Sequence, residues 1–335
     1  MKLIVTGAAG FIGMHTALSL LHEGHEVVGI DNLNDYYDIQ LKHGRLDVLL
    51  QRPGFRFFRL DIADGQALAQ CVKSERPDRV VHLAAQAGVR YSLENPMAYV
   101  SSNLVGFANI LESCRHAQVP NLVFASSSSV YGDNSRLPFS EHDPVDHPLS
   151  LYAATKRSNE LMAHSYAHLY GLPVTGLRFF TVYGPWGRPD MAPILFASAI
   201  VAGKPIRVFN HGNHRRDFTY VDDIASGVAA VATKGPGIRR TADAWPDDPA
   251  TSMAPFRIYN IGNGTPVRLL DFLSLLESCL GKKAQLELVA AQPGDVQETW
   301  ADCSDLERDF GYRPRTSLEQ GLQRFVAWFR EYYSS

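Results

Sequence analysis

Cysteine is scarce in this sequence, and the few cysteines present are not paired. Only four occur among 335 residues, and none lies in a Cys-x-x-Cys spacing: Cys71, Cys114, Cys279 and Cys303. Disulfide frameworks and zinc sites are recognised by closely spaced cysteines, and the 12 histidines show no His-x-x-Glu-His or His-x-His spacing. We therefore expect reduced thiols, no metal site and a cytoplasmic protein.

Long apolar runs and an excess of positive charge are also missing. No run reaches the roughly 18 residues that a membrane span requires, and glycines interrupt the apolar opening MKLIVTGAAGFIG, which lacks a cleavage pattern. Lys and Arg number 32 against 35 Asp and Glu, a net charge of −3. These features argue against a membrane partner, export and general nucleic-acid binding, so we expect a globular protein without such partners.

Short β-branched segments alternate with amphipathic segments through the first half of the chain. This alternation predicts parallel strands joined by crossover helices, and hence an α/β fold with a Rossmann-type doubly wound sheet. We expect an NAD-binding domain over 1–180 and a smaller nucleotide-sugar-binding domain over 181–335, with some segments interleaved. The predicted helices lie near 11–23, 64–75, 96–117, 152–170, 193–202, 222–232, 268–280 and 317–332, and 234–256 has the composition of a surface loop.

A glycine triplet near the start predicts a dinucleotide site. Gly7, Gly10 and Gly13 fall between a strand and a helix, where glycine permits a tight turn, a close pyrophosphate and close packing. Free N–H groups at the helix start suit the pyrophosphate, and Asp31 after the next strand favours NAD over NADP. A purely structural glycine turn is the alternative. The expected wall of the cofactor site comprises the glycines, Phe11, Ile12, Asp31, Asp61, Ile62, Leu83, Ala84, Ala85 and Gln86.

Tyr152 and Lys156 lie one helical turn apart and therefore share a face. Serines end the preceding predicted strand, so a Ser–Tyr–Lys group above the nicotinamide is expected. Lowering a tyrosine pKa from about 10 to about 7 takes about 4 kcal/mol, which the lysine and a cationic nicotinamide would supply together. Tyr152 would then remove a proton from a substrate hydroxyl. The alternative is a surface helix that happens to carry both residues.

These motifs resemble those of the extended short-chain dehydrogenases/reductases that act on nucleotide sugars. The resemblance covers nearly the whole chain, through TGAAGFIG, HLAAQAGVR, SSSSVYG, YAATK, RDFTYVDDI and QPGDV. Within that family, DNLNDYYDIQLKHGRL and VYGPWGRPDMA resemble the UDP-glucuronate 4-epimerase branch. The resemblance implies NAD-dependent, reversible 4-epimerisation of UDP-glucuronate to UDP-galacturonate, with a UDP-sugar as partner and a homodimer as the assembly.

The resemblance also implies roles for single residues. Ser127 would hydrogen-bond the sugar 4-hydroxyl, Tyr152 would be the acid/base, and Lys156 would contact the cofactor ribose and lower the tyrosine pKa. Asn32 and Asn103 would belong to the cofactor site. The residues implied at the nucleotide and its diphosphate are Arg90, Arg216, Gln292 and Asp295.

Thr181 distinguishes this chain from relatives that act on neutral sugars, which usually carry asparagine there. Its hydroxyl, together with Ser128 and Ser129, would surround a sugar carboxylate, and Arg188 would add a charged contact or fix the loop. The alternatives are a threonine bonded to its own backbone and an arginine facing solvent.

Ser128 and Ser129 also stand where dehydratases and decarboxylases carry acidic residues, which argues against both of these enzyme classes. A neutral UDP-hexose 4-epimerase, a UDP-glucuronate decarboxylase and a non-catalytic NAD-sensing scaffold remain the competing functions.

Overall fold

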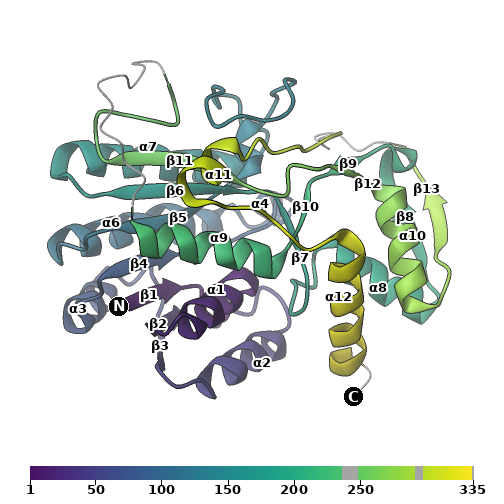
Figure 1. The fold of residues 1–335 in the computed structure, drawn as a ribbon, viewed down its shortest axis with the longest axis horizontal. Coiled ribbons are helices and arrows are strands. Elements are labelled where there is room, and N and C mark those ends of the chain that lie inside the picture. Colours follow the sequence, from purple (N-terminus) through teal and green to yellow (C-terminus); the bar gives the residue numbers. More distant parts are fainter. Residues whose placement is uncertain (236–247, 291–296, 334–335) are drawn as a thin grey trace.

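Seven parallel strands form the central sheet of the computed structural model, which describes residues 1–235, 248–290 and 297–333. The strand order is β11-β6-β5-β4-β1-β2-β3 (Figure 1). The order reverses between β1 and β4, which is where such sheets bind ligands. The strands are β1 (Lys2–Thr6), β2 (Glu26–Asp31), β3 (Phe55–Arg59), β4 (Arg79–His82), β5 (Leu122–Ser127), β6 (Val174–Phe179) and β11 (Phe256–Ile261).

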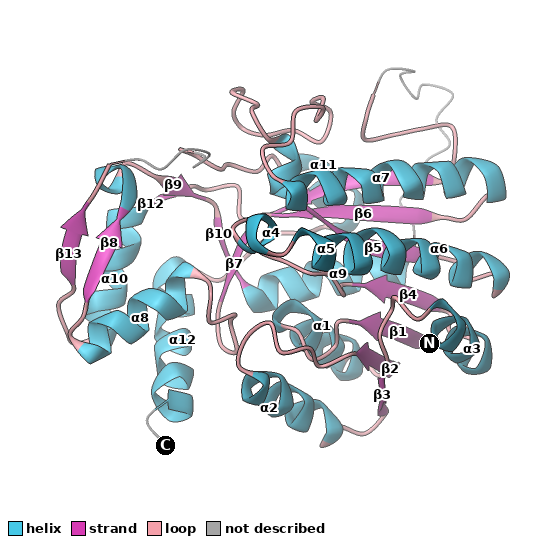
Figure 2. Cartoon of the chain, turned by 180° about the vertical axis from the view of Figure 1, so that it is seen from behind, coloured by secondary structure: helices cyan, strands magenta, loops and turns pink. Residues whose placement is uncertain are grey.

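Helices cover both faces of this sheet, which confirms the predicted doubly wound α/β fold. Helices α1 (Phe11–His22) and α9 (Val221–Lys234) pack together on one face (Figure 1). On the other face lie α3 (Gly65–Glu75), α6 (Gly106–His116) and α7 (Leu151–Tyr170) (Figure 2). Side-chain caps start two of them, because Asp64 accepts from Ala67 N at 3.0 Å and Ser150 from Ala153 N at 3.1 Å.

The remaining elements lie mainly beyond the carboxyl ends of the strands. Strands β7 (Thr181–Tyr183) and β10 (Phe218–Tyr220) pair there, as do β9 (Arg215–Arg216) and β12 (Val267–Arg268). A third pair, β8 (Pro205–Val208) and β13 (Gln285–Leu288), lies with α8 (Ala192–Ala202), α10 (Leu269–Leu280) and α12 (Leu318–Tyr333) at the right of Figure 1. Helix α11 (Ser304–Phe310) contacts β11, and short 3₁₀ segments occupy Ser128–Tyr131 and Phe209–Gly212.

Some of the helices differ from the sequence expectation. Helix α2 (Ile39–Leu50) was not predicted, because its buried side includes Lys42 and Arg45 and therefore does not look apolar. The single helix expected over 96–117 is divided into α5 (Pro96–Tyr99), a π-helical segment (Val100–Val105) and α6, after the short α4 (Tyr91–Glu94). Beyond residue 180, β11 and α9 pack with the sheet, and the sequence expectation of two domains with some interleaved segments allowed for such an arrangement.

No helix in the part of the chain that the structure describes is long and apolar enough to cross a membrane.

Candidate active site

A cavity of about 760 Å³ opens at the carboxyl ends of the strands, above the glycine turn. Gly7 has φ +70°, and a Cβ there would lie 2.8 Å from the Ala84 nitrogen. A Cβ on Gly13 would lie only 2.0 Å from the Gly7 oxygen. Because Gly10 supplies no side-chain cap, the first N–H groups of α1 stay free to bind an anion. A side chain at position 7 or 13 would collide with the backbone, so this wall requires glycine at both positions.

The cofactor wall continues along the ends of β2 and β3. Asp31, which is 9% exposed, accepts from Ala9 N at 3.1 Å and Leu33 N at 2.8 Å. Burial raises the Asp31 pKa, while these N–H groups and the Lys42 ammonium act to lower it. Asn32 donates to Asp61 at 2.9 Å. Asp31, Asn32, Asp61 and the adjacent Ile62 all line the cavity, as the sequence predicted.

The segment after β4 forms the next part of the wall, with Leu83, Ala84, Ala85 and Gln86 lining the cavity. The Gln86 side chain is 5% exposed and is hydrogen-bonded to the Tyr99 side chain. The glycine cradle, the free helix N-terminus and Asp31 fit a dinucleotide such as NAD.

Asn103 lies behind the wall instead of on it, which differs from the sequence expectation. It is 2% exposed, and its side-chain oxygen accepts from Gln86 N at 2.8 Å. Its amide nitrogen donates to Gln86 O and Thr155 Oγ1, both at 3.0 Å. Because its hydrogen-bonding groups are already used, Asn103 fixes the backbone of Gln86 from behind.

Tyr152, Lys156 and Ser127 all line the cavity. Tyr152 and Lys156 lie on the first turns of α7, and Ser127 ends β5. The Ser127 side chain is hydrogen-bonded to Tyr152 and also accepts from Ser129 N at 3.2 Å. Lys156 Nζ donates to Ala125 O at 2.9 Å. Tyr152 and Ser127 are therefore adjacent, and Lys156 lines the same cavity one helical turn from Tyr152.

The protein atoms around this centre shift the pKa values of Tyr152 and Lys156 in opposite directions. Burial raises the Tyr152 pKa, although the Ser127 hydrogen bond and the Arg188 charge oppose that rise. Burial lowers the pKa of Lys156 to about 8, and its ammonium group is bonded to Ala125. The protein atoms alone therefore do not produce a tyrosine that ionises near pH 7. The lowering that the sequence predicted requires an additional positive charge beside the phenol.

A cluster of hydroxyl groups and one arginine faces the same centre. Ser128, Ser129, Thr181 and Arg188 all line the cavity. The Thr181 hydroxyl takes part in none of the hydrogen bonds found within the described residues, so it does not cap its own backbone, and its backbone N donates to Asp217 O at 3.2 Å. The hydroxyl is thus available to a ligand.

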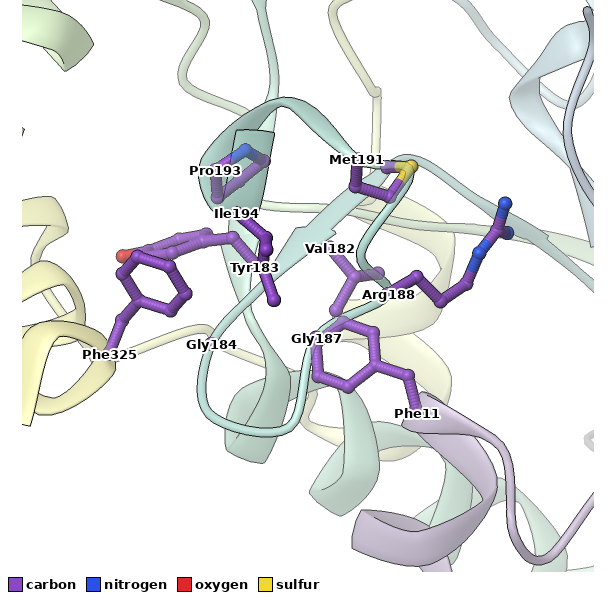
Figure 3. A pocket seen from close by; sticks show the side chains of 10 residues that line it. All are labelled: Phe11, Val182, Tyr183, Gly184, Gly187, Arg188, Met191, Pro193, Ile194 and Phe325. Atoms are coloured by element: carbon purple, nitrogen blue, oxygen red, sulfur yellow. The ribbon is translucent and has the colours of Figure 1, made fainter. Parts of the chain in front are cut away.

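Arg188 follows a tight loop that returns toward Phe11 of α1 (Figure 3). Its Nε and Nη2 donate to Asp190 at 3.0 and 2.5 Å, and the Tyr36 hydroxyl donates to the same carboxylate at 3.1 Å. The Arg188 side chain is 20% exposed. The solvent-facing alternative is therefore wrong, and Asp190 fixes the guanidinium at the cavity.

The far end of the cavity carries two more predicted cations. Arg216 donates from Nη1 to Arg215 O and Gln297 O, both at 3.0 Å, and lines the cavity beside Thr299. Arg90 lines the cavity with its guanidinium 5.7 Å from the centre of the Phe209 ring. Gln292 and Asp295, which were predicted to join this end, lie outside the described residues.

Several lining residues were not predicted. Lys42 donates to Asn34 O at 2.7 Å and to Asn34 Oδ1 at 2.5 Å, and its side chain reaches the cavity beside Tyr36 and Tyr37. Lys42, Tyr36 and Tyr37 belong to the segment DNLNDYYDIQLKHGRL, whose resemblance to one branch of the family assigned no role to these residues. The spacing of residues in the segment did not show that α2 faces the cofactor wall.

Comparisons with known proteins agree with this geometry. The model of the NAD dependent epimerase/dehydratase family matches residues 3–262. The chain is 53% identical over 333 residues to Protein CapI of Staphylococcus aureus, with 99% of each covered. It is 46% identical to a probable UDP-glucuronate 4-epimerase of Rhizobium meliloti, covering 99% of this chain and 98% of that one.

A solved structure is also closely similar. It is UDP-glucuronic acid 4-epimerase from Bacillus cereus in complex with UDP-glucuronic acid and NAD, with TM-score 0.87, 35% identity, and 99% and 100% of the two chains covered. The family match, the full-length likeness and the glycine cradle beside Tyr152 and Lys156 lead to one conclusion: the chain belongs to the NAD dependent epimerase/dehydratase family.

Proposed function

We propose that the protein is an NAD-dependent UDP-glucuronate 4-epimerase that interconverts UDP-glucuronate and UDP-galacturonate. The observation that carries the proposal is the cavity itself, because one wall suits a dinucleotide and the opposite wall presents unbonded hydroxyl groups beside a fixed guanidinium. The adjacent Tyr152 and Ser127 provide acid/base chemistry between the two walls. The likeness to UDP-glucuronate 4-epimerases over the full chain supports the same substrate.

The proposed mechanism begins with proton removal. Tyr152 takes the proton of the sugar 4-hydroxyl, and Ser127 orients that hydroxyl through its own hydrogen bond. The glycine turn, Asp31 and the Leu83–Gln86 segment would hold NAD, which would supply the hydride acceptor and donor for sugar C4. Lys156 lies one turn from Tyr152, where its charge stabilises the phenolate once it forms. The 4-keto sugar turns over within the cavity, and Tyr152 then returns the proton.

The acid group of the substrate creates a second requirement. A 4-keto glucuronate is a β-keto acid, which loses CO₂ when the bond to the carboxylate aligns with the carbonyl π system. Hydrogen bonds from Thr181, Ser128 and Ser129, with Arg188 nearby, would keep the carboxylate out of that alignment. We propose these four residues as the carboxylate site, and Arg90, Arg216, Gln292 and Asp295 as contacts of the nucleotide and its diphosphate.

A homodimer is also proposed. Met97 of α5 and Leu161 and Leu169 of α7 are 67%, 54% and 66% exposed, and Leu93 of α4, which also lines the cavity, is 77% exposed. These helices lie on one face of the molecule (Figure 2). Large apolar side chains gathered on one face are typical of an interface, and a second copy that pairs these helices would cover them.

We further propose that the protein acts in the cytoplasm and that its two functional parts divide near residue 180. Cys71 and Cys114 are buried free thiols, as expected in a reducing compartment. The first part contributes the dinucleotide wall, and the second contributes Thr181, Arg188 and Arg216 at the nucleotide-sugar wall.

The test is NMR of the sugar produced from UDP-glucuronate by the purified protein, with no cofactor added. We expect UDP-galacturonate and no UDP-pentose, because bound NAD is regenerated in each cycle. Turnover of UDP-glucose alone would identify a neutral-sugar epimerase, and CO₂ release with a UDP-pentose would identify a decarboxylase. Either result would overturn the proposal.

A further inference from the structure

Arg45 of α2 is a fully buried arginine whose guanidinium group is completely hydrogen-bonded. Its exposed fraction is 0%. Nε donates to Trp186 O at 3.0 Å, and Nη2 donates to Trp186 O at 2.7 Å and Gly187 O at 3.1 Å. Nη1 donates to Ala9 O at 3.1 Å and to the Tyr37 hydroxyl at 2.5 Å. All five N–H groups of the guanidinium are thereby used, and every acceptor is a neutral oxygen.

The four acceptor oxygens of Arg45 belong to three separate segments. Ala9 lies inside the glycine turn of the dinucleotide wall, and Tyr37 lies in the loop after Asp31. Trp186 and Gly187 immediately precede Arg188, which faces the proposed carboxylate site. One side chain therefore connects the cofactor wall to the sugar wall from behind.

The loop that Arg45 reaches has an unfavourable backbone. Trp186 has φ +62°, a conformation that is unfavourable for a bulky residue and persists only where its surroundings impose it. Two N–H groups of Arg45 bind the carbonyl of this residue. The neighbouring Gly44 leaves space for the indole ring, since a Cβ there would lie 2.8 Å from it.

The other side of the indole is also enclosed. The centre of the Trp186 ring lies 5.5 Å from the centre of the Trp328 ring and 5.2 Å from that of the Tyr332 ring, both on α12. Figure 3 shows the loop that carries Gly187 and Arg188 returning beside Phe11, the first residue of α1. Two consecutive residues of α2 therefore stabilise the same loop. Gly44 leaves room for the Trp186 side chain, and Arg45 binds the Trp186 carbonyl.

We propose that Arg45 is a positioning residue that sets the location of Arg188 relative to the glycine turn. It touches neither substrate nor cofactor and acts through the 184–188 loop. In the proposed reaction, on which this inference rests, that spacing determines whether the acid group stays bound while sugar C4 faces the nicotinamide. Loss of Arg45 would loosen the carboxylate site and permit CO₂ loss, while Asp31 and the helix N-terminus still bind the dinucleotide.

The test compares Arg45→Lys with the wild-type full chain. Lysine keeps the charge but has three donors on one nitrogen, so it cannot span the three segments. We expect the KM for UDP-glucuronate to rise about tenfold, which corresponds to about 1.4 kcal/mol. The fraction of UDP-pentose should rise by a similar factor, with bound NAD per chain unchanged. Arg56→Lys is the matched control, because Arg56 pairs with Glu75 at the edge of the sheet.

A double-mutant cycle separates positioning from general destabilisation. If Arg45 acts through Arg188, then adding Arg45→Lys to an Arg188→Met variant should not raise the UDP-pentose fraction further. Independent effects in the double variant, or an unchanged KM and product ratio in Arg45→Lys, would overturn the inference. If Arg45→Lys does not fold, Tyr37→Phe removes one acceptor and should give a smaller shift in the same direction; no shift would contradict the inference. Wild-type protein that fails to epimerise UDP-glucuronate would instead contradict the proposed function.

Discussion

At the scale of single residues, the chemistry depends on a tyrosine that the protein by itself keeps neutral. Burial raises the Tyr152 pKa, and Lys156 is bonded to a main-chain carbonyl. A positive charge supplied from the dinucleotide wall would favour the phenolate, so acid/base competence would follow cofactor binding. This coupling would prevent the empty site from carrying a reactive phenolate.

Tyr152→Phe should reduce turnover of UDP-glucuronate by at least about a hundredfold, because general acid/base catalysis typically contributes that much or more. Bound NAD should stay at the wild-type level, since the glycine turn and Asp31 are unchanged. Turnover measured by NMR, with NAD measured after release from the protein, checks both parts. Retained activity would show that Tyr152 is not the acid/base.

Thr181→Asn should increase the UDP-pentose fraction formed from UDP-glucuronate. The change replaces an unbonded hydroxyl at the cavity wall with a longer amide, which crowds the carboxylate and alters its hydrogen bonds. Product analysis by NMR gives the ratio of pentose to galacturonate. Thr233→Asn on α9 is the control, because the Thr233 hydroxyl bonds Ala229 O within its own helix. Equal pentose-to-galacturonate ratios in the two variants would show that Thr181 has only a structural role.

At the scale of elements, separate helices and loops are joined by charged side chains. His142, in the loop between β5 and α7, contacts Asp248 at 2.9 Å and Asp305 of α11 at 3.1 Å. Asp305 also pairs with Arg257 and Arg308. Hydrogen bonds with Asp248 and Asp305 raise the pKa of His142 to about 10. The imidazolium therefore connects this loop to the β11 side of the sheet.

The stabilisation from His142 should depend on pH in a defined direction. Because the folded-state pKa is raised from 6.5 to about 10, the contribution is fully present below about pH 6.5 and is lost as the pH rises through 10. His142→Gln should therefore lower the free energy of unfolding more at pH 6 than at pH 10.5. Urea unfolding of both proteins at the two pH values measures this difference. An equal effect at both pH values would contradict the assignment.

At the scale of the whole molecule, the exposed apolar face of α4, α5 and α7 should determine the assembly. Met97→Glu places a charge in the proposed interface and should convert the dimer to a monomer in analytical ultracentrifugation. Leu50→Glu is the matched control, because Leu50 ends α2, away from that face, and is 54% exposed. A wild-type monomer, or a Met97→Glu dimer as stable as the control, would rule out this interface.

The sequence by itself determined the fold class, the glycine turn, and the grouping of Tyr152 and Lys156. Those features follow from local periodicity and from residues a few positions apart, which the chain fixes before it folds. It did not reveal α2, because a helix that buries Lys42 and Arg45 has no apolar stripe, nor the break near Asn103, because π-helical turns have no simple periodicity.

Only the tertiary structure decided how distant segments meet. Arg188 is fixed by Asp190 and Tyr36, and Arg45 joins Ala9 to Trp186 across 177 positions of sequence. Strand β11 enters the sheet from beyond residue 180 because its main-chain groups find partners beside β6. Such contacts depend on directional hydrogen bonds between groups that become neighbours only after folding, and no local pattern encodes them.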